Sequence, residues 1–201
     1  MAEEKQAEEK KPVAKKTPQI DKWKKKKWFK IHASPEFDKR VIGETPAEKT
    51  KQLEGRKINA SLGELTNQRQ KRHITVKFRV KEIAGQDTFT ELIGHEINTS
   101  YIGRMVNRRN SKMETVQSIP TKEDEKIKIK AVTISARKLE KDQETAIRKI
   151  MVSRIEKEVR KKAVGQVLQE IIFGVLAAKV FKDAKKIAPL KRVEITKSEI
   201  V

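Results

Sequence analysis

The stretch ITVKFRVKEIAGQDTFTELIGHEI, Ile74 to Ile97, decides the fold class of this chain. Its first half alternates Ile, Val and Phe with Thr, Lys and Arg, a period of two that is typical of a β-strand with one buried face. Gly85 to Asp87 is a turn signal, and Thr88–Ile97 can return as the partner strand. This stretch therefore predicts an antiparallel β-hairpin.

Similar patterns on both sides of this hairpin predict more short strands. Met113–Ile119 and Ile127–Ser135 are expected to form a second hairpin around a loop at 120–125. Several short strands separated by turns favour a closed or nearly closed antiparallel barrel. Additional strands are expected at 28–33, 57–62 and 190–196.

A short helix is predicted between the two hairpins. Asn98, Thr99 and Ser100 are good cap residues, and the apolar residues that follow them make one side of a helix. Arg104 and Arg108 are four residues apart, so they are expected to share the opposite face.

The C-terminal third is predicted to be helical. Apolar residues recur at spacings of three and four from Ile147 to Val159, which indicates an amphipathic helix whose basic sides are hydrated. The segment from Val164 to Ala188 is more broadly apolar. Gly174 is expected to divide it into two helices, and Pro189 is expected to end it.

These elements together predict an α+β fold in one globular domain. An antiparallel β-barrel-like core with one inserted short helix is expected over residues 22–140, and C-terminal helices over 141–201 are expected to pack on it. Residues 1–21 contain Glu, Lys, Ala, Gln and Pro but almost no apolar side chains. Such a composition predicts a flexible, disordered basic tail.

The charge of the chain predicts a polyanionic partner. Lys and Arg number 48 against 28 Asp and Glu, which gives a formal net charge of +20. Solubility alone needs a net charge of only about 2–8 for a small domain. An excess of this size repels itself in a compact fold, and a nucleic acid removes that cost while its phosphates release counterions.

Catalysis and metal binding find little support in the sequence. The chain has no Cys, which excludes disulfides, thiolate metal sites and a Cys nucleophile, and fits a reducing intracellular compartment. His32, His73 and His95 lie far apart, and no zinc-protease or nucleophile-elbow motif is present. We therefore expect neither an enzyme nor a bound cofactor or metal.

Nucleotide binding and membrane insertion are not expected either. Gly43–Thr50 nearly matches a phosphate-binding loop, but Glu48 stands where the second Gly belongs and adds bulk and negative charge beside the anion. The longest apolar run, Ile171–Ala178, is far shorter than the ~20 residues of a membrane-spanning helix. The acidic N-terminal residues do not resemble a secretory signal.

Three basic clusters are the candidate RNA-binding sites. The first is WKKKKWFKIHA, Trp23–Ala33, in which lysines reach phosphates and an indole can stack on an unpaired base. The alternative is that its aromatic residues anchor the tail. We interpret Trp28 and Phe29 as core residues, and Trp23 and the lysines as RNA contacts.

The second cluster lies on and after the inserted helix, where arginines can clamp phosphates bidentately. The third leads into the first hairpin, and its strand face either binds RNA or is simply hydrated. The candidate RNA-binding residues are Lys22, Trp23, Lys24, Lys25, Lys26 and Lys27 in the first cluster, Arg104, Arg108, Arg109 and Lys112 in the second, and Arg69, Lys71, Arg72, Lys77 and Arg79 in the third.

Four stretches in a fixed order resemble a known family. They are WKKKKWFKIHA at 23–33, LEGRKINASLGEL at 53–65, IGRMVNRRNSKME at 102–114 and TAIRKIM at 145–151. From about Asp21 to Thr196, the order and spacing resemble the small-subunit ribosomal proteins of archaea and eukaryotes called the eukaryotic-type S-one, or S-three-a, family. Because the long C-terminal extension of eukaryotic members is missing, the chain resembles an archaeal member.

The resemblance implies a barrel-like core with C-terminal helices, in one copy on the platform of the small ribosomal subunit in the cytoplasm. Its partners would be ribosomal RNA, neighbouring ribosomal proteins and, near the exit, messenger RNA, with no membrane contact and no homo-oligomer. The alternative is a free-standing basic RNA chaperone or general nucleic-acid-binding protein. An RNA-modifying enzyme would need a cofactor loop or an acid–base set, and the sequence offers neither.

Overall fold

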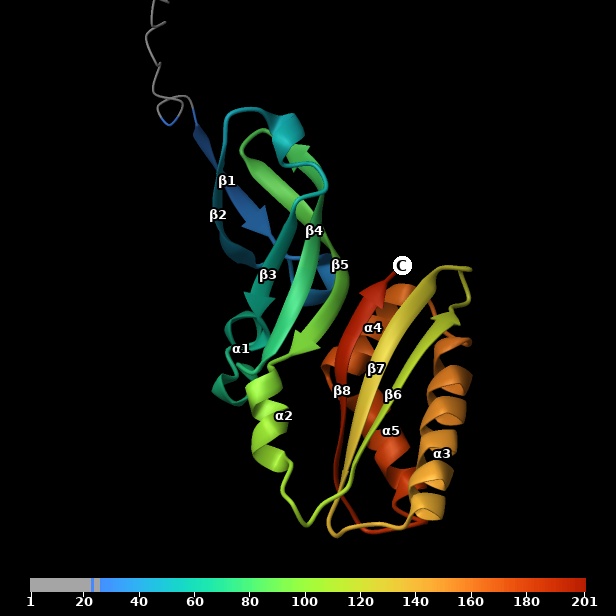
Figure 1. Ribbon diagram of the computed structural model, residues 1–201. Helices are drawn as coiled ribbons and strands as arrows, with labels where there is room; N and C mark the ends of the chain where they lie inside the picture. Colours follow the sequence, from blue (N-terminus) through green and yellow to red (C-terminus); the bar gives the residue numbers. More distant parts are fainter. Residues whose placement is uncertain (1–22, 24–25) are drawn as a thin grey trace, which may run out of the picture.

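The computed structural model describes residues 23 and 26–201, so the tail expected over 1–21 lies outside the described residues. Figure 1 shows two groups of strands side by side, with the C-terminal helices beside the second group. In chain order the elements, with η marking a 3-10 turn, are β1 Lys27–His32, η2 Pro35–Phe37, β2 Val41–Ala47, η3 Thr50–Gln52, β3 Lys57–Ser61, α1 Leu62–Leu65, η4 Arg69–Lys71, β4 Ile74–Ala84, β5 Asp87–Ile97, α2 Thr99–Met105, β6 Lys112–Pro120, β7 Lys126–Ser135, α3 Lys141–Val159, α4 Val164–Ile172, α5 Val175–Ala184 and β8 Leu190–Ile200.

The hairpin that the sequence predicts is confirmed as β4 and β5. The two strands pair antiparallel from Ile74 opposite Ile97 to Ala84 opposite Asp87. The other edge of β5 is shared between two partners, because β1 pairs parallel with residues 87–89 and β8 pairs antiparallel with residues 94–96. Strand β5 therefore joins an N-terminal group of strands, β1 to β5, to a C-terminal group, β6 to β8 (Figure 1).

The barrel-like core that the sequence predicts is not confirmed, because the sheet is open. The strands follow the order β2-β1-β5-β8-β7-β6, with β4 and then β3 attached to β5. Between β2 and β3 the described residues form no ladder; instead Arg56 Nη1 donates a hydrogen bond to Thr45 Oγ1 at 2.5 Å. The parallel β1–β5 pair also departs from the purely antiparallel expectation.

Strand β2 has no counterpart in the sequence-based prediction. Its sequence, VIGETPA, contains Gly43 and Pro46, which weaken a strand pattern, yet it pairs with β1 alone and so tolerates a proline at the sheet edge. The stretch that nearly matches a phosphate-binding loop therefore forms an extended strand followed by the single turn η3.

The core of the C-terminal part lies between strands β6 to β8 and helices α3 to α5. Helix α3 buries Ile147, Met151, Ile155 and Val159, the apolar series that predicts it. Helices α4 and α5 are separated at Gly174, whose φ of 83° suits glycine, and they bend by 70° as a pair. Within the described residues no single helix is long and apolar enough to cross a membrane. Helices α4 and α5 reach that length and apolar character only when the bent pair is counted together.

Helix α2 is shorter than the sequence predicts. Asn98 caps it as expected, since its side-chain oxygen accepts a hydrogen bond from the Ser100 N–H at 3.0 Å. The helix ends at Met105, and Val106 is already extended. Arg108 therefore lies beyond the helix, and the prediction that it shares a helix face with Arg104 is wrong. A β-branched Val followed by Asn favours leaving the helix at this point.

Candidate nucleic-acid interface

Two exposed tryptophans stand at the beginning of β1. The side chains of Trp23 and Trp28 are 59% and 55% exposed, and their rings meet edge to face with centroids 6.5 Å apart. The Lys26 ammonium lies 4.4 Å from the Trp23 ring centroid. We call Trp23, Lys26, Lys27 and Trp28 the tryptophan patch.

The expectation that Trp28 belongs to the core is wrong, whereas that for Phe29 is confirmed. Side chains alternate along a strand, and β1 directs Phe29 and Ile31 inward, each 4% exposed. Trp28 must therefore point outward. Lys26 and Lys27 are exposed and, in the described part of the chain, pair with no carboxylate. Lys22, Lys24 and Lys25 lie outside the described residues.

The second cluster divides into solvent-exposed and paired cations. Arg108 and Arg109 form an exposed turn after α2, and no carboxylate among residues 26–201 pairs with either. Lys112, by contrast, lies 2.5 Å from Glu114, which also contacts Lys130 at 3.0 Å. The hydrogen bonds from Lys112 and then Lys130 hold the pKa of Glu114 below its ordinary value.

The third cluster divides in the same way. Arg69 and Arg72 are exposed around η4, and Lys71 lies over the Phe173 ring with its Nζ 5.2 Å from the centroid. On β4, Lys77 pairs with Glu96 at 2.5 Å and Arg79 pairs with Glu91 at 4.0 Å across to β5. This strand face is a row of cross-strand ion pairs, which favours the hydrated alternative.

The basic side of α3 is also occupied by ion pairs. Arg148 contacts Glu144 at 3.2 Å, and Arg160 contacts Glu156 at 2.5 Å, both within the helix. Exposed pairs of this kind contribute little to stability, and within the described residues Lys149 and Lys157 of this helix have no carboxylate partner. The sequence-based interpretation of this helix as hydrated is consistent with these contacts.

The structure brings the η4 and α2 clusters together. His73, which follows η4, stacks on Tyr101 of α2 with ring centroids 3.8 Å apart. The guanidinium carbons of Arg104 and Arg192 each lie 5.8 Å from the Tyr101 ring centroid. Partial burial lowers the pKa of His73, so the positive charge here comes from Arg and Lys. We call this cluster the η4–α2 belt: Arg69, Lys71, Arg72, Arg104, Lys191 and Arg192.

Sequence reasoning missed the β8 members of the belt. Lys191 and Arg192 lie nearly ninety residues after α2, yet the Lys191 Nζ reaches the Met105 carbonyl at 3.5 Å. Their only signal in the sequence is a pair of adjacent cations at the beginning of the last strand.

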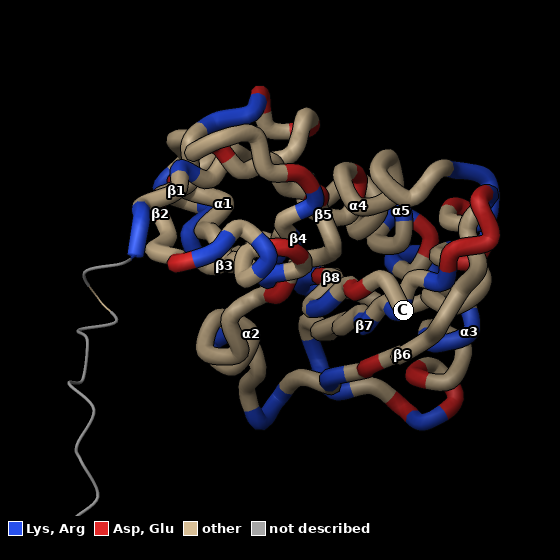
Figure 2. Tube along the Cα trace, turned by 90° about the horizontal axis from the view of Figure 1, so that it is seen from above, with Lys and Arg blue, Asp and Glu red and all other residues tan. Residues whose placement is uncertain are grey.

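The tryptophan patch and the η4–α2 belt lie at opposite ends of the N-terminal group of strands. In Figure 1, β1 begins at the end where the β4–β5 turn lies, whereas α2 lies at the other end. Figure 2 shows basic segments at the beginning of β1 and in the loop after α2, and closely mixed charges over α3. An extended anionic partner could therefore contact the molecule at two separate basic sites. The described residues contain no group of His, Asp or Glu side chains that could hold a metal ion.

Comparisons with known proteins agree over most of the chain. The model of the Ribosomal S3Ae family matches residues 14–201. The "Small ribosomal subunit protein eS1" of Haloarcula marismortui is 33% identical over 175 residues, which cover 87% of this chain and 82% of that protein. The proteins of the same name from Methanobrevibacter smithii and Sulfurisphaera tokodaii are 32% and 33% identical, covering 90% and 94% of this chain and 94% and 98% of their own lengths.

Proposed function

This chain belongs to the ribosomal S3Ae family, as an archaeal eS1-type member, and from this premise we propose that it is a structural protein of the small ribosomal subunit that binds ribosomal RNA. Its place of action is then the ribosome in the cytoplasm. The family resemblance extends the proposal to the subunit platform near the messenger RNA exit, with neighbouring ribosomal proteins as further partners.

The tryptophan patch is the observation that carries RNA binding. Two large indoles more than half exposed to water are an unusual surface, because each could bury a large apolar area in a core. Beside unpaired lysines, they have the composition of a site that stacks bases and neutralises the backbone. Phe29 anchors β1 from its buried side, so Lys27 and Trp28 of the patch are held on a strand of the sheet.

Three arginines of the η4–α2 belt and two of the turn after α2 are the proposed phosphate contacts: Arg69, Arg72, Arg104, Arg108 and Arg109. Arginine presents a planar fork of donors that matches phosphate oxygens, and each neutralised phosphate releases condensed counterions. Contacts of this kind fix register and orientation without reading sequence, which suits a protein that stabilises a folded RNA. Lys77, Arg79, Lys112 and Arg192 are weaker candidates because carboxylates already pair with them.

Sedimentation tests the ribosomal role. Cell lysate is fractionated on sucrose gradients at low and moderately raised salt, and the protein is located with an antibody. We expect it to sediment with the small subunit at both salt concentrations. A protein that stays near the top of the gradient would instead be a free-standing RNA chaperone.

Substitutions at Trp28 test the stacking role. Trp28→Phe keeps an aromatic face, whereas Trp28→Leu keeps only apolar character. Base stacking contributes about 1–3 kcal/mol per base, so Trp28→Leu should weaken binding to small-subunit ribosomal RNA by roughly tenfold while Trp28→Phe remains near wild type. Val116→Ala, at a valine that is 58% exposed on β6, is the control. Equal binding by the Leu and Phe variants would show that Trp28 does not stack on RNA.

A further inference from the structure

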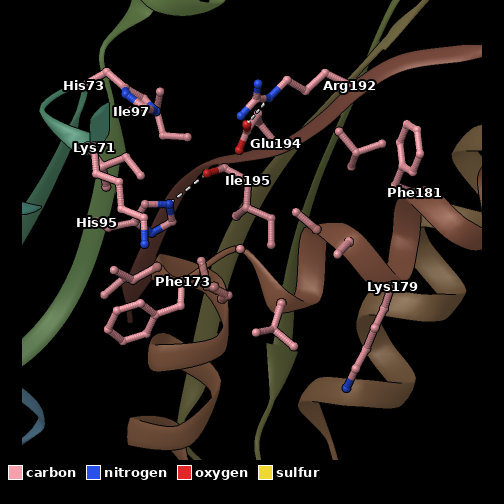
Figure 3. Close-up of a pocket in the computed structure, with 18 of the residues that line it drawn as sticks. Lys71, His73, His95, Ile97, Phe173, Lys179, Phe181, Arg192, Glu194 and Ile195 are labelled. Carbon is pink, nitrogen blue, oxygen red and sulfur yellow. Dashed lines mark hydrogen bonds and ion pairs between the residues drawn. The ribbon is translucent and has the colours of Figure 1, made fainter. Parts of the chain in front are cut away.

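A groove lies between β8, the bent α4–α5 pair and the end of the N-terminal group of strands. Its volume is about 830 Å³, and its walls come from Ile172, Ala178, Val193 and Ile195 among others. Figure 3 shows Phe173 and Phe181 on the helical side and Lys71, His73 and Arg192 on the opposite side. None of the arginines proposed above as phosphate contacts lines this groove, although Lys71, Lys191 and Arg192 of the η4–α2 belt do.

The bend between α4 and α5 leaves apolar side chains uncovered in the groove. Gly174 turns the chain in the left-handed region, and the residues on either side of it, Phe173 and Val175, are each 44% exposed. They belong to the few large apolar side chains that remain exposed among the described residues. An apolar surface with a polar rim is typical of a site that another molecule covers.

The rim of the groove is cationic. Of its charged residues, Glu194 is the only acid, and Arg192 neutralises it at 2.6 Å. Lys179 is likewise paired, with Glu158 at 2.7 Å. Lys71, Lys182 and Lys191 also line the groove, and in the part of the chain that the structure describes no carboxylate pairs with them. Charge complementarity therefore requires an acidic partner.

The polar groups inside the groove are not available to read a nucleic-acid base. Both ring nitrogens of His95 already have partners. Nδ1 lies 2.6 Å from Ser198 Oγ, and Nε2 lies 2.8 Å from the Ile195 carbonyl oxygen, the contact drawn in Figure 3. Cations lie over the phenylalanine rings: Lys71 Nζ is 5.2 Å from the Phe173 centroid, and Lys185 Nζ is 5.8 Å from that of Phe181. A base would find neither an open aromatic face nor an uncommitted hydrogen-bonding group in the interior.

We propose that this groove binds an acidic peptide segment of another protein, with apolar side chains seated against Phe173 and Val175 and carboxylates on Lys71, Lys182 and Lys191. Apolar walls inside a charged rim match the anatomy of a peptide-binding groove. If the proposed function is correct, the protein that provides this segment is a neighbour in the ribosomal subunit. The acidic and apolar character of the segment is inferred from the groove alone and does not depend on the proposed function.

Fluorescence anisotropy with the full chain tests the proposal. The probe is a labelled amphipathic peptide of about four helical turns with Leu on one face and Glu on the other, and its control is a scrambled peptide of the same composition. We expect the amphipathic peptide to bind more tightly than the scrambled one. Val175→Glu and Lys182→Glu should each weaken its binding at least about tenfold.

Two matched substitutions on α3 control for net charge. Val152 is 38% exposed and Lys149 is exposed, and neither lines the groove, so Val152→Glu and Lys149→Glu change charge equally and should leave binding nearly unchanged. Val175 is the first residue of α5, where Glu suits the helix dipole, and thermal unfolding checks that each variant folds. If Val175→Glu is destabilised, Lys182→Glu, at an exposed site, decides.

Three results would overturn the proposal: equal weakening by the groove and α3 variants, equal binding of the scrambled peptide, or displacement of the peptide by single-stranded oligouridine whose own affinity falls in Val175→Glu. The last would assign the groove to RNA. Because the assay uses purified protein, its result is independent of the sedimentation experiment. Failure to sediment with the small subunit would remove the ribosomal role and leave the peptide site standing.

Discussion

At the scale of single residues, Gly94 and His95 of β5 are where the N-terminal group of strands meets β8. A Cβ atom on Gly94 would lie 2.1 Å from the Ser198 carbonyl oxygen, which is backbone and cannot rotate away. The neighbouring His95 is 1% exposed and bonds to Ser198 and Ile195 on β8. Gly94 therefore lets β8 approach β5 closely, and the hydrogen bonds of the buried His95 imidazole hold β8 in that position.

Gly94→Ala should be strongly destabilising. The added methyl must push β8 away from β5, which costs packing and hydrogen bonds, so we expect a loss of at least about 2 kcal/mol in the free energy of unfolding. Chemical denaturation measures this loss. Gly103→Ala is the matched control, since a Cβ there meets nothing within 4 Å. A loss at Gly94 no larger than that at Gly103 would contradict the close approach.

The burial of His95 predicts a defined acid sensitivity. Desolvation lowers its pKa from 6.5 to about 4, against the opposing effect of the Ile195 carbonyl. Between pH 6.5 and about 4, His95 is protonated in the unfolded chain but neutral in the folded chain. The free energy of unfolding therefore falls as the pH drops through this range. The full loss is about 3 kcal/mol. Unfolding free energies measured across this range should flatten in His95→Gln; an unchanged slope would show that His95 is not the titrating group.

At the scale of elements, an ion-pair network fastens α3 to α4 and α5. Glu158 contacts Lys162 at 3.1 Å, Lys179 at 2.7 Å and Arg154 at 3.4 Å. Lys162 also contacts Glu170 of α4 at 2.6 Å. The hydrogen bond from Lys179 is the main cause that lowers the pKa of Glu158 to about 2. The network adds to the apolar packing that already holds the three helices together.

Glu158→Gln should destabilise the helical part more than a comparable change nearby. Glu158 is only 18% exposed, and its removal takes a shared partner from three cations that keep only Asp183 and Glu170, so we expect a loss of about 2 kcal/mol. Glu156→Gln is the control, since its pair with Arg160 is solvent-exposed and contributes well under about 1 kcal/mol. The Glu158 contribution is present above pH 4.5 and lost as the pH falls towards 2, below the window of His95. Thermal unfolding of both variants at neutral pH and pH 3 measures it.

Some elements of the fold can be predicted from the sequence alone. The β4–β5 hairpin, the division at Gly174 and the last strand follow from local periodicity and turn chemistry, so the sequence predicts them. Strand β2 is not predicted, because Gly43 and Pro46 break the local strand pattern and the strand is stabilised instead by pairing with β1. The outward direction of Trp28 depends on the register of β1, and the open sheet depends on β5 taking two partners on one edge. These are tertiary choices that no local window contains.

The candidate sites follow the same division. Charge clusters are visible in the sequence, but whether a cation is neutralised depends on its neighbour across the sheet. Lys77 and Arg79 look like Arg108 and Arg109 in sequence, yet only the first two have carboxylate partners on the adjacent strand. The His73–Tyr101 stack, which draws Arg104 and Arg192 together, joins elements far apart in the chain.

At the scale of the whole molecule, the net charge is +20, and its Lys and Arg side chains include both paired and unpaired cations. Only the unpaired cations should neutralise RNA phosphates and so release counterions. We expect Arg108→Ala and Arg109→Ala each to reduce the slope of log affinity against log salt by about 1. Arg160→Ala removes the same charge from an ion pair and should leave the slope nearly unchanged. Binding to small-subunit ribosomal RNA over a salt series measures all three; equal slope changes would show that long-range charge alone governs binding.

The double partnership of β5 has a consequence for how the protein matures. Strands β1 to β5 all lie within residues 27–97 and can assemble among themselves, whereas β7 must wait for β8, whose partner residues follow some sixty positions later. During vectorial synthesis the first group can therefore fold while the C-terminal helices are still being made, and one edge of β5 stays uncovered until β8 arrives. Exposed strand edges invite aggregation. A nascent chain paused after α3 should thus be more dependent on chaperones than the finished protein.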